Sequence, residues 1–223
     1  MQDETKKNWK SLLFPLVWEA LFVASYLVVA LRDDKRHFSL TLYFMFFFYL
    51  GLLVYYRRDF SLKEFFLNFT KWKEFILPVM FTAAGAALAR AVFSCVGTKL
   101  FPDSLNIVLP LAYSSNVFET ILFALTVMLL KPVASELFFR KGWIDFSGRG
   151  IFLFTVVTGF LLEAVTRSIT PLGILETVLL AVPFVIAYCV TKNVYVSLFV
   201  HLIFGIVVNM PDVIYDFMRL ALA

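Results

Sequence analysis

Charged and imidazole side chains stand inside apolar stretches of the C-terminal half, where they could do chemistry. Glu136 and Arg140 are four residues apart, as are Glu163 and Arg167, and His201 lies in the middle of a later apolar stretch. Ionisable groups in hydrocarbon are costly unless they are paired or hydrated, so these residues are functional candidates. A carboxylate beside an imidazole can activate water for hydrolysis. A carboxylate beside a guanidinium can instead hold helices together.

The spacing favours a structural role for part of this set. Residues four apart share one helix face, so each glutamate can neutralise an arginine on its own helix. For Glu163 and Arg167 we expect such an intrahelical ion pair at the level of the lipid headgroups. Glu19, Arg90 and Glu176 are more isolated, and Glu19 with Arg90 could form a pair between two helices.

His201 begins a polar stripe on an otherwise apolar helix. Gly205 and Asn209 follow it at intervals of four residues, which places all three on one face. The sequence has one other histidine, His37, so a multi-histidine metal site is excluded. We expect no metal and no cofactor, and a lone histidine of this kind often bonds one helix to another.

The composition indicates a membrane protein. Of the 223 residues, 61% are apolar and 16% are charged, and the mean hydropathy is +0.85. Soluble proteins have about a quarter charged residues, which a water-facing surface needs. No stretch is long and polar enough for a separate soluble catalytic domain. The net charge of +4 arises from short loops beside apolar spans, which argues against a nucleic-acid interface.

Dividing the chain by the roughly 20 apolar residues that cross a bilayer predicts an all-α, polytopic transmembrane bundle. We expect about seven spans, or eight if a weakly assigned part also crosses. The predicted spans cover residues 12–31, 38–56, 75–96, 116–140, 151–169, 172–190 and 194–209. Asn116 and Glu119 have the spacing of a helix cap, and Pro132 predicts a kink. Pro211 and Asp212 are expected to end the last span.

Other segments suggest contacts outside the helix core. Residues 57–73 alternate basic and aromatic side chains, which is typical of an amphipathic helix on the bilayer surface. In the third span Gly85 and Ala89, and likewise Ala87 and Ala91, are four apart and would let another helix approach closely. We expect Gly85 and Ala89 to bind a partner. Residues 97–115 are predicted as a loop, which separates N-terminal helices (1–115) from a C-terminal core (116–223).

The distribution of basic residues predicts the orientation. The side that carries the N-terminus has about twice as many lysines and arginines as the other side, which makes it cytoplasmic. That side has Lys6, Lys7, Lys10, Arg57, Arg58, Lys63, Lys71, Lys73, Arg140, Lys141, Arg149 and Lys192. The other side has Arg32, Lys35, Arg36, Lys99, Arg167 and Arg219. Arg140 is thus expected near the cytoplasmic face of a plasma membrane. The heavy use of Phe, Leu and Lys, together with the family resemblance described below, suggests a bacterial membrane.

The most specific pattern surrounds Glu136. Residues 131–143 read KPVASELFFRKGW, with a proline before a glutamate and an arginine four residues after it. This block resembles the first motif of the CAAX protease and bacteriocin-processing family (CPBP, also called Abi) of intramembrane glutamic proteases. The family's second motif, Phe-x-x-x-His, aligns with residues 160–164, and its third, His-x-x-x-Asn, with residues 201–205. The resemblance covers residues 116–209 and implies the family's four-helix core.

The resemblance also implies where catalytic groups would stand. In the family, the first Glu of motif one and the His of motif two activate water, and the His and Asn of motif three stabilise the oxyanion. Hydrolysis needs a proton acceptor within about 3 Å of the attacking water. The four corresponding positions here are Ser135, Ala164, His201 and Gly205, so three of the four groups are replaced. The residues that still match the motifs are Glu136, Arg140 and His201.

We therefore expect a pseudoprotease that acts as a membrane scaffold or regulator. Its CPBP-like helix core would bind a membrane-anchored or transmembrane protein, such as a cell-envelope enzyme or a sensor. By the same resemblance, family members with decayed motifs regulate other membrane proteins. Its expected surroundings are the lipid bilayer and this protein partner, without nucleic acid.

Two alternatives remain open from the sequence. The first is an active intramembrane glutamic endopeptidase, in which Glu136 or Glu163 is the base and His201, helped by Asn209, stabilises the oxyanion. The second is a small ion or proton-coupled transporter. Its path would use Glu19, Arg90, Glu163 and Glu176.

Overall fold

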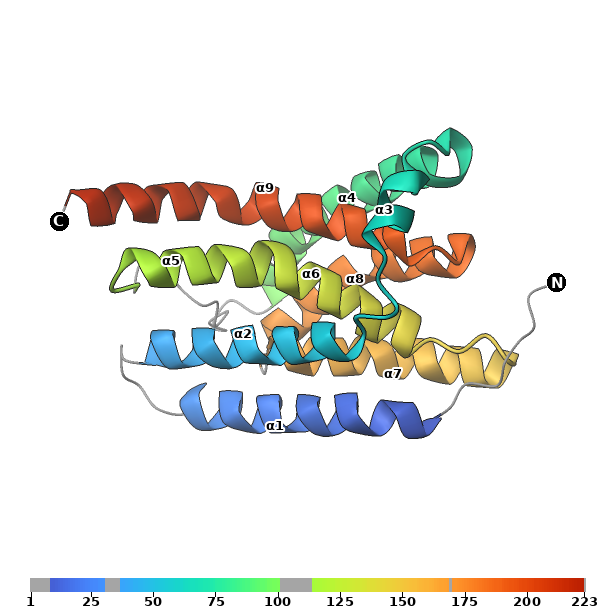
Figure 1. The fold of residues 1–223 in the computed structure, drawn as a ribbon, viewed down its shortest axis with the longest axis horizontal. Helices are drawn as coiled ribbons and strands as arrows, with labels where there is room; N and C mark the ends of the chain where they lie inside the picture. Colours follow the sequence, from blue (N-terminus) through green and yellow to red (C-terminus); the bar gives the residue numbers. More distant parts are fainter. Residues whose placement is uncertain (1–8, 31–36, 101–113, 169, 223) are drawn as a thin grey trace.

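The computed structural model describes residues 9–30, 37–100, 114–168 and 170–222. Within them the fold is all-α, and seven helices are long and apolar enough to cross a membrane, which confirms the predicted bundle. α1 begins at the end of the bundle where α9 begins, and α9 ends at the opposite end (Figure 1), as seven crossings require. Several predicted features lie outside the described residues, namely Lys6, Lys7, Arg32, Lys35, Arg36 and the loop at 101–113.

The spans follow the predicted order closely. They are α1 (Leu13–Ala30), α2 (His37–Tyr55), α4 (Leu77–Leu100), a composite fourth span, α7 (Arg149–Arg167), α8 (Pro171–Thr191) and α9 (Val194–Ala221). The composite span joins α5 (Val117–Ala124), π-helical η4 (Leu125–Leu130), α6 (Lys131–Ser135) and π-helical η5 (Glu136–Gly142). A 3₁₀ turn, η1 (Trp9–Leu12), precedes α1, and α3 (Leu62–Asn68) with π-helical η2 (Trp72–Ile76) precedes α4.

The fourth span begins with the predicted cap. The Asn116 side-chain oxygen accepts a hydrogen bond from the backbone N–H of Glu119 at 3.0 Å, and the Glu119 carboxylate accepts from Ser115 N at 2.8 Å. The predicted kink site, Pro132, lies between the two π-helical segments. A π turn holds one extra residue and often marks a functional site. In η5 the wider π-helical turn contains five consecutive buried residues, Glu136 to Arg140.

Two predicted boundaries are wrong. α4 continues to Leu100, so the predicted loop does not begin at residue 97. α9 continues through Pro211 to Ala221, although an internal proline costs a helix about 3 kcal/mol. Tertiary contacts account for the second difference, because Val213 packs in an apolar cluster with α2 and α5 residues and Asp216 is buried and hydrogen-bonded. The segment after Pro211 is therefore an ordered continuation of α9 that is anchored to the bundle by Val213 and Asp216.

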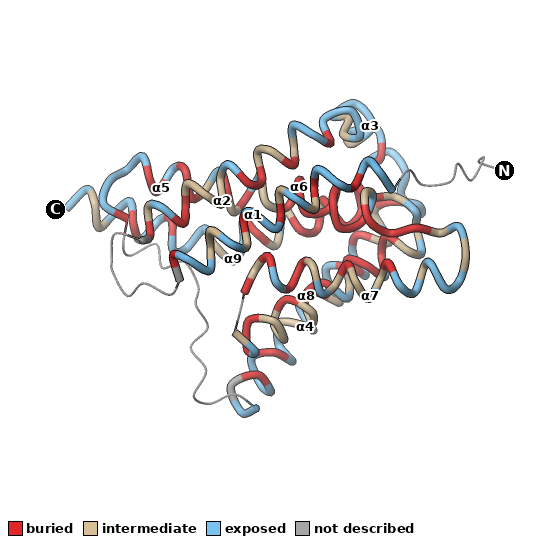
Figure 2. The backbone as a smooth tube through the Cα atoms, turned by 90° about the horizontal axis from the view of Figure 1, so that it is seen from below, coloured by how far each residue is buried: buried red, intermediate tan, exposed pale blue. Residues whose placement is uncertain are grey.

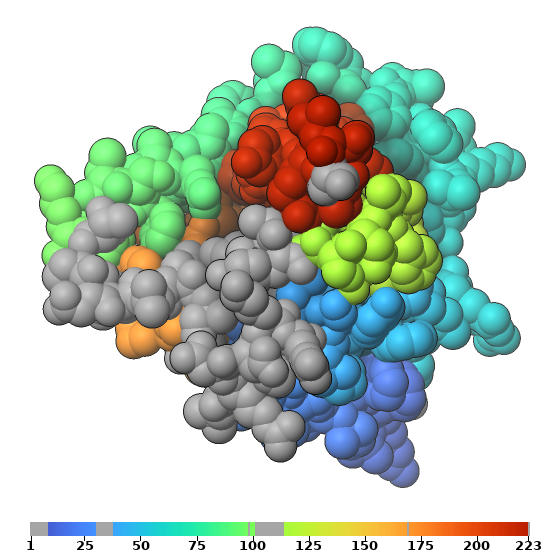
Figure 3. Space-filling view, turned by 90° about the vertical axis from the view of Figure 1, so that its left-hand side faces the viewer, coloured from blue at the N-terminus to red at the C-terminus, as the bar shows by residue number. Residues whose placement is uncertain are grey.

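Helices from both predicted parts of the chain pack together. α2 contacts α5 and α6, α1 contacts α7, and α4 contacts α8 and α9. Figure 3 shows the end of the bundle that carries the last turn of α9. There α9, α5, α2 and α1 lie in a row, and the end of α4 lies to the left of this row. The C-terminal end of α4, with the start of α8 beside it, projects from the other helices (Figure 2). Of the seven spans, α4 buries the smallest share of its residues.

Candidate functional site

Five ionisable side chains from three spans meet inside the bundle. η5 supplies Glu136 and Arg140, α7 supplies Glu163 and Arg167, and α9 supplies His201. Each Glu and Arg pair is four residues apart and shares a helix face, as predicted. The structure adds contacts between the helices, which the spacing did not show. We call these five residues the charged cluster.

Glu163 joins the two arginines. One of its carboxylate oxygens bonds to Nη1 of Arg140 on η5, and the other lies 2.8 Å from Nη2 of Arg167 on its own helix. The expected intrahelical pair therefore forms in the last turn of α7, with Glu163 buried and Arg167 largely buried. Arg140 also lies near Glu136, with 3.4 Å between Nε and Oε2. Two carboxylates thus neutralise two guanidiniums.

His201 closes the cluster from the third helix. Its Nδ1 lies 2.8 Å from Oε1 of Glu136, and its Nε2 lies 3.2 Å from Nη2 of Arg167. A guanidinium can only donate, so Nε2 is the acceptor and Nδ1 carries the proton that is donated to Glu136. The ring of Phe184 stacks on the imidazole at 5.0 Å between centroids. The imidazole is therefore neutral and fixed on both edges and one face.

The charged cluster is almost completely buried. Glu136 is 0% exposed, Arg140 and Glu163 are each 1% exposed, and His201 is 5% exposed. The side chain of Arg167 is 14% exposed and forms the rim. Not every polar atom is satisfied by a hydrogen bond. Among the described residues, the cluster atoms without a hydrogen-bond partner are Nε and Nη2 of Arg140, Nε of Arg167, Oε2 of Glu136 and Oε1 of Glu163. Buried charges of this kind are retained only when they compensate one another.

The remaining motif positions have small side chains in close-packed places. Ser135 is 0% exposed, and its hydroxyl has no hydrogen-bond partner within the described part of the chain. Ala164 is also buried. Gly205 faces the fourth span, and a Cβ there would lie 3.4 Å from the Val127 carbonyl oxygen and 3.6 Å from Cγ of Pro132. A glycine at this position therefore lets α9 lie close against η4 and α6.

The more isolated ionisable residues have other partners than predicted. Glu19 accepts a hydrogen bond from Oγ1 of Thr166 at 2.6 Å. Arg90 on α4 pairs with Glu176 on α8. The predicted pair between Glu19 and Arg90 is therefore wrong, because each side chain is bound to a different helix. No spacing rule shows such contacts, which join positions 147 and 86 residues apart.

The small-residue face of α4 is used within the chain. A Cβ on Gly85 would lie 3.2 Å from Cβ of Pro183, so α4 approaches α8 closely there. Gly85 and Ala89 are both half-buried, whereas Ala87 and Ala91 are exposed. The close approach that the sequence indicates is made to α8 of the same chain. That Gly85 and Ala89 contact a partner stays a prediction.

The charged cluster leaves little freedom for acid-base chemistry. Each carboxylate is held by cations, and the one basic atom of the imidazole, Nε2, accepts from Arg167. A general base must reach the proton of an attacking water, and both carboxylates are buried away from the surface. Within the described ranges, no three His, Cys, Asp or Glu side chains gather as metal ligands. The arrangement is best suited to holding η5, α7 and α9 in one relative position.

Comparison with known proteins assigns no family to this chain. No protein-family model matches it, and neither the curated proteins nor the solved structures include a match. The resemblance to the CPBP family therefore rests on the motif residues alone, above all on Glu136 and Arg140. It stays a prediction, and so do the roles that it implies.

Proposed function

We propose that this chain is a non-catalytic member of the CPBP family that holds a membrane-anchored partner protein. The observation that carries the proposal is the position of Glu136, the glutamate next to the serine of motif one. Its carboxylate contacts both Arg140 and His201 in a fully buried place. The group that would have to activate water is thus engaged as a structural anion.

The same contacts argue against the endopeptidase alternative. Glu136 and Glu163 are the two carboxylates of the cluster, and both are matched by guanidiniums. For catalysis by Glu136, a water would have to enter the buried cluster and displace a cation or the imidazole. Such a displacement would leave a charge unpaired in a low-dielectric core, which is strongly unfavourable. The cluster therefore supports a folded scaffold better than a hydrolytic site.

We place the partner on the exposed side of α4. Ala87 and Ala91 are exposed on consecutive turns, on the face of α4 opposite Gly85, which faces α8. Within a bilayer, helices associate through small residues that let backbones approach closely. Exposed Leu88 borders the two alanines on the helix surface and would contact the same partner helix. The proposed partner contributes a transmembrane segment, as a membrane-anchored enzyme of the cell envelope or a sensor would.

The orientation belongs to the same proposal. Arg140 and Arg167 were counted as loop charges on opposite sides, but both bind Glu163 inside the bundle. Omitting both leaves the excess of basic residues on the side where α1 begins. By that excess the side is cytoplasmic, and the membrane is proposed to be a bacterial plasma membrane. Arg140 then lies two residues before the cytoplasmic end of its span, Gly142.

Site-specific photo-crosslinking in native membranes tests this function. A photoreactive amino acid at Leu88 should give one discrete product with an uncut membrane protein, and the same residue at Leu153 on α7 should not. Ala87→Leu and Ala91→Leu should weaken the product because a larger side chain keeps the partner's backbone away. Val165→Leu, also exposed but on α7, is the matched control. Equal, diffuse products from Leu88 and Leu153 would contradict the proposed face.

A further inference from the structure

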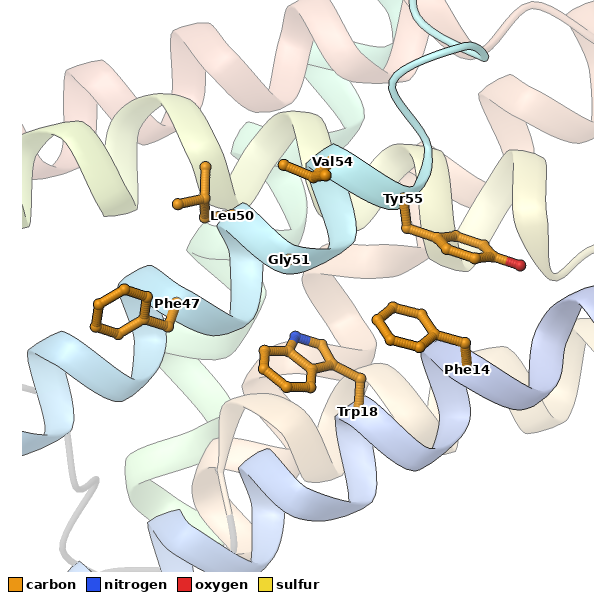
Figure 4. A pocket seen from close by; sticks show the side chains of 7 residues that line it. All are labelled: Phe14, Trp18, Phe47, Leu50, Gly51, Val54 and Tyr55. Carbon is orange, nitrogen blue, oxygen red and sulfur yellow. The ribbon is translucent and has the colours of Figure 1, made fainter.

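An apolar groove lies on the outer surface between α1 and α2, far along the sequence from the charged cluster. Its volume is about 460 Å³. Phe14 and Trp18 of α1 form one wall, and Phe47, Leu50 and Val54 of α2 form the other (Figure 4). Tyr55 lines the groove at the end where α1 begins and α2 ends. The groove thus lies in the membrane and runs toward the side of the basic loops.

The lining of this groove is almost purely apolar because its two polar groups are already bound. The indole N–H of Trp18 donates to the Phe48 carbonyl at 3.0 Å, and the Tyr55 hydroxyl donates to the Ser11 carbonyl. Phe14 stacks on Tyr55 at 5.0 Å between centroids. A Cβ on Gly51 would lie 2.6 Å from Nε1 of Trp18, so the indole packs directly on the α2 backbone. The walls are therefore shaped and held before anything binds.

A smaller, partly polar cavity of about 190 Å³ adjoins the groove. The two spaces meet where Tyr55 of the groove bonds to Ser11, which lines the small cavity. Tyr56 also lines it, and the phenol oxygen is buried without a hydrogen-bond partner among the described residues. Burial raises the pKa of Tyr56, so this hydroxyl keeps its proton and can donate. Lys141 lines the same cavity and pairs with Asp59 at 3.2 Å.

The turn at 56–59, which contributes Tyr56 and Asp59 to the small cavity, also carries two basic residues. Arg57 and Arg58 directly follow Tyr56, are exposed, and form no ion pair within the described part of the chain. Asp59 is the one acidic residue of the turn at 56–59, and it is matched by Lys141. The turn therefore keeps an excess of positive charge. An apolar groove in the hydrocarbon thus ends at a cationic rim with a free buried donor.

We propose that the groove and the small cavity together bind one anionic phospholipid, with an acyl chain along the groove and the phosphate at Tyr56, Arg57 and Arg58. The acyl chain gains little from leaving other lipid tails, since those are equally apolar, so the chain contributes packing against the aromatic walls. Selection among lipids must then come from the headgroup, through attraction between the negative charge and the basic rim. The inference depends on the membrane location alone and not on the proposed scaffold function.

Native mass spectrometry of the detergent-solubilised protein tests this site. The probes are phosphatidylglycerol and phosphatidylcholine with identical acyl chains, so that only the headgroup charge differs. Wild type should retain phosphatidylglycerol in preference to phosphatidylcholine. Arg57→Gln combined with Arg58→Gln should weaken phosphatidylglycerol binding by roughly tenfold or more and should remove the preference. The control variant combines Lys71→Gln with Lys73→Gln. It removes two exposed cations at the beginning of η2 and should leave binding of both lipids unchanged.

A groove-filling variant separates the lipid from other occupants. Val54 is 55% exposed, so Val54→Trp should fold and fill the groove, and it should reduce retention of both lipids. Equal retention of the two lipids by wild type, unaffected by the double arginine variant, would overturn the proposal. Wild type could instead give the mass of a dimer and no lipid adduct. If Val54→Trp abolished that dimer, the groove would be assigned to a second copy of the chain, and the lipid proposal would be overturned.

Discussion

Nδ1 of His201 lies 2.8 Å from Oε1 of Glu136, and this contact joins η5 to α9 across 65 residues of sequence. Because Arg167 approaches the other nitrogen of the same imidazole, α7 is joined as well. Three spans thus share one unit of hydrogen bonds and ion pairs, in which each side chain has two partners. Changing one member should therefore affect the whole unit, and the following predictions use this property.

Glu136→Gln should lower the free energy of unfolding by about 2 kcal/mol, because a neutral amide no longer balances Arg140. The amide oxygen can still accept from His201, which limits the loss. Unfolding in mixed micelles at increasing SDS fraction measures the change. Glu74→Gln makes the same change at an exposed residue of η2 and should be neutral. An equal effect of the two variants would contradict the assigned role.

Glu163→Gln should destabilise the protein more than Glu136→Gln does. Glu163 pairs with two guanidiniums, Arg140 and Arg167, whereas Glu136 pairs with Arg140 alone, so neutralising Glu163 removes two ion pairs. Removing one partner of a buried ion pair costs about 3–5 kcal/mol. The same SDS titration gives the comparison. A smaller loss for Glu163→Gln would show that Glu163 is not the centre of the cluster.

A double-mutant cycle should reveal coupling between Glu136 and His201. His201→Ala removes a hydrogen bond to Glu136 and the stacking on Phe184, so the double variant should lose less than the sum of the single variants. Coupling of about 0.5–3 kcal/mol is typical of residues in direct contact. In a control cycle, Glu136→Gln with Asp216→Asn should be additive, because Asp216 lies four turns further along α9. Strict additivity in the first cycle would contradict the contact.

Asp216→Asn should loosen the last turns of α9. The Asp216 carboxylate is buried and accepts from Thr120 Oγ1 at 2.6 Å and from Arg219 Nη2 at 2.6 Å, and it also bonds to Ser114. These contacts fix the segment after Pro211 on α5. Hydrogen exchange of residues 212–221 should become faster, while Asp212→Asn, at an exposed position, should leave it unchanged. Unchanged exchange in Asp216→Asn would show that apolar packing of Val213 is sufficient.

The sequence predicted the fold well because membrane spans are set by long apolar runs. Seven spans and the Asn116 cap follow from hydropathy and spacing. The end of α9 was missed because a proline normally stops a helix, and the opposing contacts of Val213 and Asp216 are made to residues about 100 positions away. Such contacts depend on the tertiary arrangement and leave no local pattern.

The sequence predicted which residues belong to the candidate site, but it did not predict which of them contact one another between helices. The spacing of Glu136 with Arg140 and of Glu163 with Arg167 follows from helix periodicity, and both pairs are present. That Glu163 also binds Arg140, and that His201 binds Glu136, requires the packing of η5, α7 and α9. For the same reason Gly85 could be identified as a close-approach position, but its partner Pro183 could not.

The central claim is that the charged cluster supports binding and does no hydrolysis. The most direct test is purification from native membranes of wild type beside Glu136→Gln, with intact mass and terminal sequencing of the copurifying membrane protein. The account predicts that wild type retains an uncut partner, and that Glu136→Gln yields less of the same uncut partner. Fragments with a constant new terminus in wild type, together with uncut partner trapped by Glu136→Gln, would show an active protease and contradict the account.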